Sequence, residues 1–155
     1  MDFRITGLDP TPFIPLYGLP DAQLGDLGIL RRIADAPNTM PDRIELRDVE
    51  QGKTALLLNH EYLDAPSPYR GRHAIFVREG AEQAFDQINQ VPDSIRRRLM
   101  SLRAFSEHGM IIDADVVQGT ALESLIERLF SHAEVSFIHA HHARYGCYAA
   151  RIDRV

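Results

Sequence analysis

The stretch FIHAHHARYGCYAA, residues 137–150, predicts two β-strands joined by a short turn. It holds three of the seven histidines and the only cysteine of the chain. Because side chains alternate between the two faces of a strand, His139 and His141 share one face and His142 points to the other. Two imidazoles at this spacing can bind a metal ion or a substrate, can transfer a proton, or can simply line a polar patch. The stretch alone leaves these alternatives open.

Segments rich in β-branched and aromatic residues predict further strands around this pair. His73–Arg78 is predicted to be a central strand, with Ile75 and Val77 on one face. Met100–Phe105 and Met110–Val117 are predicted to form a hairpin, because a turn-forming Gly109 follows Glu107 and His108 between them. Shorter strands are predicted at Ile29–Ala34 and at the apolar run Ala55–Leu58.

Fewer segments predict helices. The clearest is Ala121–His132, whose apolar residues recur at helical spacing, and Thr120 with Glu123 has the spacing of a capping box. Shorter helices are predicted at Asp21–Leu27 and Asp93–Leu99. Strands outnumber helices, so we expect an α+β fold with a largely antiparallel or mixed β-sheet and two or three helices.

The chain length indicates how these elements are organised. A chain of 155 residues is typical of one domain. Residues 7–20 contain too many prolines and glycines for a regular element, but they also contain apolar side chains that can pack. We therefore expect a single domain with this Pro-rich N-terminal arm packed on it.

The charge and the cysteine count exclude several classes of protein. The net charge is −5, which argues against a nonspecific nucleic-acid binder, and the run Arg96–Arg98 is predicted to be a solvated helix face. One cysteine cannot form an intramolecular disulfide. The N-terminus lacks the apolar run of a signal peptide, and no stretch is long and apolar enough to cross a membrane. We expect a cytoplasmic protein without a membrane or nucleic-acid partner, and its oligomeric state stays open.

Three long blocks also carry a resemblance to a known family. They are LLLNHEYLDAPSPYRGRHAIFVREGA at residues 56–81, SLRAFSEHGMIIDADVVQGT at residues 101–120 and FIHAHHARYGCYAARIDR at residues 137–154. Together with the opening FRITGLDPTPF, they resemble a bacterial family known only as domain of unknown function twelve-oh-three. The resemblance extends over nearly the whole chain and implies a soluble, single-domain bacterial protein. It implies no activity, ligand or catalytic residue.

The segment Ser67–His73 has the composition of a binding loop. Its prolines restrict the backbone, its glycine allows close approach, and guanidinium groups recognise carboxylate or phosphate bidentately. We therefore predict a pocket for a small anionic or polar ligand, in which Arg70 is the best single candidate for ligand contact. This pocket requires the strand that His73 opens to lie beside the strand of the histidine pair. The predicted ligand-binding residues are Tyr69, Arg70, His73, Arg103, His139 and His141. The alternative is a surface turn whose arginines pair with acidic residues.

Two further chemistries stay open. His139 and His141, with His73 as a third ligand, can form a metal site, although C-x-x-C and H-E-x-x-H patterns are absent. Cys147 is near His142 and Arg144 in sequence and can be a nucleophile, or it can be a small buried apolar residue. A protein-interaction module without catalysis is a further hypothesis, beside the ligand pocket and the metal site. The sequence does not decide whether the protein is an enzyme or which cofactor it uses.

Overall fold

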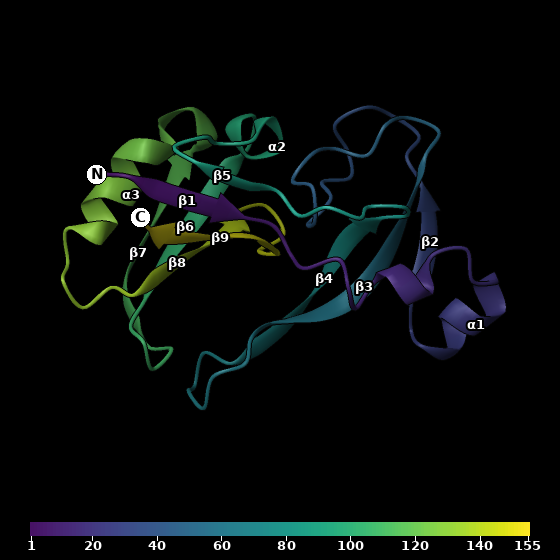
Figure 1. The fold of residues 1–155 in the computed structure, drawn as a ribbon, viewed down its shortest axis with the longest axis horizontal. Coiled ribbons are helices and arrows are strands. Elements are labelled where there is room, and N and C mark those ends of the chain that lie inside the picture. Colours follow the sequence, from purple (N-terminus) through teal and green to yellow (C-terminus); the bar gives the residue numbers. More distant parts are fainter.

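The computed structural model describes residues 1–155, which form a single α+β domain with two antiparallel sheets and three α-helices (Figure 1). In the six-stranded sheet the order is β5-β1-β9-β8-β6-β7. Its strands are β1 (Phe3–Thr6), β5 (Asp86–Ile88), β6 (Leu99–Phe105), β7 (Ile111–Gln118), β8 (Phe137–His142) and β9 (Tyr148–Arg154). The three-stranded sheet has the order β2-β3-β4, with β2 (Leu30–Ile33), β3 (Thr54–Leu63) and β4 (Gly71–Arg78). The predicted fold class is therefore confirmed.

The histidine-rich stretch forms β8 and β9, as predicted, and the two strands pair around a turn. Strand β8 lies between β9 and β6, and all six of its residues are buried. Ile138 and Ala140 belong to the largest hydrophobic cluster, whereas His139 and His141 point to the opposite face. The alternation of one strand thus separates the apolar core of the large sheet from a polar face.

Helix α3 (Leu122–Phe130) covers the apolar face of the large sheet (Figure 1). The side chains predicted to form its apolar stripe are all buried: Leu122, Leu125, Ile126, Leu129 and Phe130. The predicted capping box is wrong, because the helix begins after Ala121 and no side chain caps it. The carboxylate of Glu123 instead accepts a hydrogen bond of 2.8 Å from Arg96 Nη1.

The other two helices are short. Helix α1 (Asp21–Asp26) has nearly the predicted bounds. Helix α2 (Asp93–Arg96) ends earlier than the predicted Leu99, because Leu99 is already the first residue of β6 and pairs with β7. None of the three helices is long and apolar enough to cross a membrane.

The small sheet has its own hydrophobic cluster, to which Leu56, Leu58, Ile75 and Val77 contribute from β3 and β4. Ile75 and Val77 share the buried face, in agreement with the predicted alternation. However, β4 lies at the edge of the sheet and β3 is its centre, so the prediction of a central strand is wrong. Apolar residues of the arm, above all the buried Phe13, pack into this cluster.

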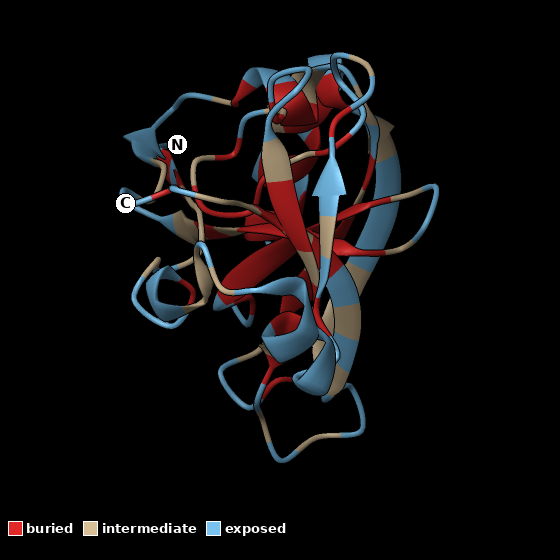
Figure 2. Ribbon diagram, turned by 90° about the vertical axis from the view of Figure 1, so that its right-hand side faces the viewer, coloured by how far each residue is buried: buried red, intermediate tan, exposed pale blue.

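The long loop between β2 and β3, two strands of the small sheet, lies against the large sheet, and buried segments meet in the middle of the molecule (Figures 1 and 2). The backbone N–H of Leu8 in the arm donates to the carbonyl of Arg43 in this loop at 2.8 Å, so the arm and the loop run side by side. Gly7 is required here, because an added Cβ would overlap the carbonyl oxygen of Ile44. The loop is therefore held close to the large sheet.

Candidate functional site

A cavity with a volume of about 590 Å³ lies where three segments meet: the β2–β3 loop, the chain after α2 and the β8–β9 turn. Four arginines line it, namely Arg43, Arg97, Arg98 and Arg144. His142 and Cys147 also line it, and no aspartate or glutamate does. We call this space the arginine cavity. Its wall is dominated by hydrogen-bond donors and positive charge.

Arg43 is the most unusual residue of this wall, because its side chain is large and charged but only 2% exposed. Its Nε donates a hydrogen bond of 2.7 Å to the carbonyl of Tyr148, and its Nη1 donates to the carbonyl of Pro41. Its Nη2 donates to Sγ of Cys147 at 3.1 Å. No carboxylate pairs with Arg43. Burial lowers the pKa of this guanidinium, and the neighbouring Cys147 and Asp42 oppose that shift.

Arg97 and Arg98 share a single acidic partner. Arg98 Nη2 is 2.6 Å from Oδ1 of Asp48, and Arg97 Nη1 is 3.1 Å from Oδ2 of the same carboxylate. Arg98 also donates to the carbonyls of Ser94 and Asn38, at 2.6 and 2.9 Å. The guanidinium of Arg98 is therefore fixed by four acceptor atoms. Two positive charges here face one negative charge.

The β8–β9 turn contributes long, exposed side chains to the wall of the cavity. Arg144 is exposed and takes part in no ion pair, and Tyr145 is 86% exposed. Gly146 has a φ of 79°, in the left-handed region that favours glycine, so the turn closes within a few residues. Arg144 can therefore rotate toward a ligand without breaking an existing contact.

His142 supplies a neutral polar group to the same wall. Its side chain is 7% exposed, and its Nδ1 is buried without a hydrogen-bond partner. Burial lowers the pKa of His142 to about 3, and the positive charges of Arg43 and Arg98 add to this effect. The imidazole is thus neutral at neutral pH. An unpaired buried nitrogen is costly, so a ligand atom that bonds it gains that free energy.

Of the residues predicted from the sequence to bind a ligand, Arg103, His139 and His141 come together on the polar face of the large sheet. Arg103 lies directly opposite His139 in the pairing of β6 with β8. The ring centroids of His139 and His141 are 6.2 Å apart. Tyr62 of β3 approaches His141 edge-on, with a centroid distance of 5.0 Å. This histidine face is therefore covered by the small sheet.

Both histidines of this face are neutral. Burial lowers the pKa of His139 to about 3 and that of His141 to about 4. Nδ1 of His141 is 2.9 Å from the carbonyl oxygen of Gly146, which fixes that nitrogen as the donor. Nε2 of His141 and Nδ1 of His139 have no partner. No three His, Cys, Asp or Glu side chains lie close enough together to hold a metal ion.

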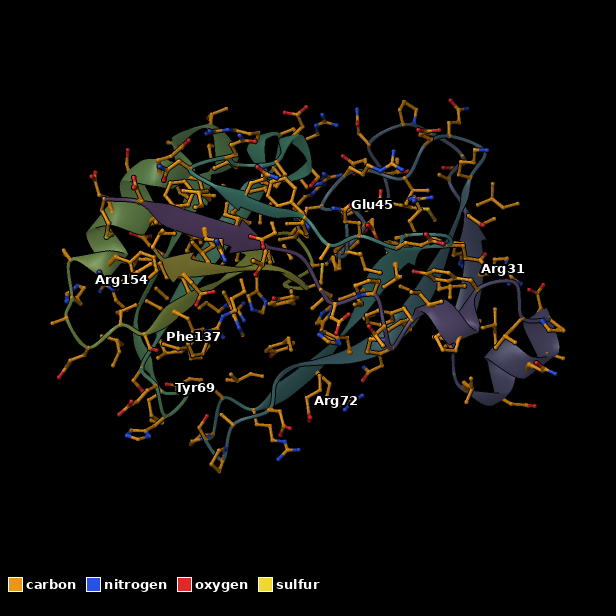
Figure 3. The ribbon with its side chains drawn as sticks, in the orientation of Figure 1. Arg31, Glu45, Tyr69, Arg72, Phe137 and Arg154 are labelled. Atoms are coloured by element: carbon orange, nitrogen blue, oxygen red, sulfur yellow. The ribbon has the colours of Figure 1, made fainter.

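The loop residues lie further out. The ring of Tyr69 is 6.3 Å from that of Phe105, which in turn is 5.2 Å from His139, and Figure 3 shows Tyr69 on the same side of the molecule as Phe137. Arg70 is exposed, and its guanidinium lies 3.2 Å from Glu61 and 3.1 Å from Asp64. These contacts match the alternative to the binding loop, a surface turn whose arginines pair with acidic residues.

His73 lies on β4 opposite His60 of β3 and is half-buried. Strand β4 pairs only with β3 and is therefore not a sheet neighbour of β8, but His73 lies near enough to His141 for its charge to help lower the pKa of that imidazole. The predicted pocket residues are therefore divided between two sheets. Arg103, His139 and His141 lie on the large sheet, whereas His73 belongs to the small sheet and Arg70 to the loop before it.

Sequence reasoning missed Arg43, Arg97 and Arg98 as members of one site. The run Arg96–Arg98 has the pattern of a solvated helix face, and nothing in the residues around Arg43 indicates that its side chain is buried. The signal that could have found the cavity is the close spacing of His142, Arg144 and Cys147, which all line it.

Comparison with known proteins gives one match. A family model described as "Protein of unknown function (DUF1203)" matches residues 39–154. These residues include every arginine of the cavity, His142 and Cys147. No curated protein and no solved structure matches the chain.

Proposed function

The chain belongs to the DUF1203 family, and we propose that it binds a small anionic ligand in the arginine cavity. The observation that carries this proposal is the wall itself: four guanidinium groups and no carboxylate line a space of about 590 Å³. This volume lies within the range of roughly 300–1,000 Å³ that is usual for small-molecule pockets.

The unbalanced charge favours an anion over a neutral ligand. Arg43 is buried without an acidic partner: two carbonyl groups and the sulfur of Cys147 accept hydrogen bonds from its guanidinium, but no negative charge lies beside it to balance its own. Arg144 is unpaired at the rim of the same space. A carboxylate or phosphate that enters the cavity supplies the missing negative charge, and its oxygens match the donor geometry of a guanidinium.

The arginines differ in what they contribute. Arg98 is held by Asp48 and two carbonyl groups, so it presents a fixed charge at no further entropic cost. Arg144 is free to close on the ligand from the turn. His142, whose buried Nδ1 is unpaired, adds a neutral polar side chain to the wall beside them. A ligand with one anionic group and one further polar atom fits this set of donors and acceptors.

A thermal-shift screen tests the proposal directly. We expect pyrophosphate, inorganic phosphate or citrate to raise the melting temperature of the protein at constant ionic strength, because a ligand that binds the folded state stabilises it. Arg144→Gln should lose most of this response. Arg32→Gln is the matched control, because Arg32 is an exposed arginine on β2 outside the cavity. No response of the parent to any of these anions, or an equal response of Arg144→Gln, overturns the proposal.

The pocket predicted from the sequence, with Tyr69, Arg70, His73, Arg103, His139 and His141, is the competing location for the same kind of ligand. Arg103 supports it, because this arginine lies beside His139 and takes part in no ion pair. The two locations are separated by one variant in the same screen. Arg70→Gln leaves the response unchanged if the anion occupies the arginine cavity, and weakens it if the anion occupies the predicted pocket.

We also assign the protein to the cytoplasm. Cys147 is a free cysteine in the wall of the cavity, and a free functional thiol is maintained most readily in a reducing compartment.

A further inference from the structure

We propose that Cys147 is a nucleophile and that the arginine cavity directs small carboxylate-bearing electrophiles to its sulfur. This inference rests on the proposed anion site and adds a covalent reaction to it. Cys147 is 8% exposed and lines the cavity. A reagent that reaches the sulfur through this cavity therefore passes beside the arginines.

The hydrogen bond from Arg43 places a positive charge directly beside the sulfur. A guanidinium has donors and no acceptor, so the Nη2–Sγ contact of 3.1 Å makes the sulfur the acceptor. Cysteines beside a positive charge are the ones that react, because the thiolate is the nucleophile. Arg43 is itself immobilised by the carbonyl of Tyr148, 2.7 Å from its Nε. Arg43 is thus a positioning residue for Cys147.

A second and independent observation points to a ligand at this place. His142 lines the same cavity, is 7% exposed and has a buried Nδ1 without any hydrogen-bond partner. The backbone N–H of His142 donates to the carbonyl of Cys147 at 2.8 Å, so the two residues lie opposite each other across the β8–β9 turn. An unpaired polar atom beside the sulfur is expected where a bound molecule completes the hydrogen bonding.

The reaction is a substitution at carbon. A lone pair of Sγ forms the S–C bond, the bond between that carbon and its leaving group breaks, and the leaving group departs with the bonding electron pair. The thiol proton passes to water in the cavity. The carboxylate of the electrophile stays paired with the arginines, which holds the carbon near the sulfur and raises the effective concentration of the reagent. No oxidant or reductant is consumed.

Two reagents of nearly equal size separate the two parts of this inference. Iodoacetate carries a carboxylate and iodoacetamide does not, so an ordinary exposed thiolate reacts more slowly with iodoacetate because of charge repulsion. We expect folded protein to reverse this order. The ratio of the iodoacetate rate to the iodoacetamide rate at Cys147 should be at least ten-fold higher in the folded protein than in the same protein unfolded in urea. Intact-mass spectrometry measures both rates, and Cys147→Ser should form no adduct.

Variants of the cavity provide the controls. Arg144→Gln should lower the ratio of the iodoacetate rate to the iodoacetamide rate several-fold, whereas Arg32→Gln should leave that ratio unchanged. If the ratio of the iodoacetate rate to the iodoacetamide rate is equal in folded and unfolded protein, the inference is overturned. If, in addition, no anion changes the melting temperature in the thermal-shift screen, the anion site is overturned as well. If anions stabilise the protein but neither reagent modifies the folded chain faster than it unfolds, only the nucleophilic role of Cys147 fails.

Discussion

Arg43 and Cys147 are separated by 104 positions in the sequence and are joined by a hydrogen bond of 3.1 Å from Nη2 to Sγ. The same guanidinium also bonds the backbone of Tyr148. These contacts fasten the loop between the two strands β2 and β3 to the beginning of β9. The arginine cavity exists because this loop is held at that position.

Replacing Arg43 should therefore destabilise the whole fold. In Arg43→Met the side chain keeps its approximate length, but the carbonyl groups of Tyr148 and Pro41 lose their donors inside the protein. Each unpaired buried group costs about 1–3 kcal/mol, so we expect the free energy of unfolding to fall by roughly 2–6 kcal/mol. Urea denaturation measures this change.

Cys147→Ala is the control for Arg43→Met. It removes the sulfur but leaves the guanidinium bonded to both carbonyl groups, so its cost should stay near 1 kcal/mol, or about that of a small cavity. If Arg43→Met were as stable as Cys147→Ala, the guanidinium would not be what fastens the loop.

The approach of the arm to the loop gives a second stability prediction. Gly7→Ala places a Cβ against the carbonyl of Ile44, which is backbone and cannot rotate away. We expect a loss of about 1–3 kcal/mol in the free energy of unfolding, which is typical of overpacking. Gly25→Ala in α1 meets no atom within 4 Å and should stabilise the protein by about 0.5–1 kcal/mol. The opposite signs of the two changes, measured in urea, test the close approach; equal effects would contradict it.

The buried histidines predict how stability depends on pH. Burial lowers the pKa of His139, His141 and His142 to about 3, 4 and 3, against an ordinary value of 6.5. Below pH 6.5 these histidines are protonated in the unfolded chain. In the folded chain they stay neutral until the pH falls to their lowered pKa values. Stability is therefore complete above pH 6.5 and falls as the pH drops toward 4, by about 1.4 kcal/mol per histidine for each pH unit.

A histidine variant isolates this effect. Urea denaturation at several pH values between 7.5 and 5 should show a shallower slope for His139→Leu than for the parent. His108→Ala should keep the parent slope, because the His108 side chain is 82% exposed in the β6–β7 turn. A parent protein that is equally stable at pH 7.5 and pH 5 would show that the histidines are solvated.

Local sequence patterns predict a helix or strand well where burial of one of its faces is enough to determine it. The apolar stripe of Leu122 to Phe130 and the alternation around Ile75 both appear in the structure, because burial selects one face of a helix or strand. The position of a strand within a sheet depends on distant partners. His73–Arg78 was therefore predicted as a central strand, although β4 pairs only with β3.

The site was only partly predictable for the same reason. His142, Arg144 and Cys147 are close in sequence, so their proximity in the fold follows from one turn. Arg43 joins them only through the path of a long loop, and no local pattern encodes that path. The preference for Arg70 followed from its prolines and glycine, but the acidic residues that pair with it, Glu61 and Asp64, belong to the end of another strand and the turn after it.

Arg70→Ala gives a prediction that separates a ligand contact from a surface ion pair. The Arg70 side chain is 54% exposed and contacts two acids at the surface, where such pairs contribute roughly 0–1 kcal/mol. We therefore expect the free energy of unfolding to change by less than about 1 kcal/mol. High salt should shrink that difference further. A loss of several degrees in melting temperature would instead identify Arg70 as a residue that stabilises the fold.

The location of the anion is measured most directly by NMR of the arginine side chains. Nε–Hε resonances of ¹⁵N-arginine-labelled protein can be assigned with Arg144→Gln, Arg98→Gln and Arg70→Gln, and then followed while pyrophosphate or citrate is added. Our account predicts saturable shifts at Arg144 and Arg98, with Arg70 and Arg72 unaffected. Shifts confined to Arg70, Arg72 and Arg103, or no saturable shift at any arginine, would contradict the claim that the arginine cavity binds an anion.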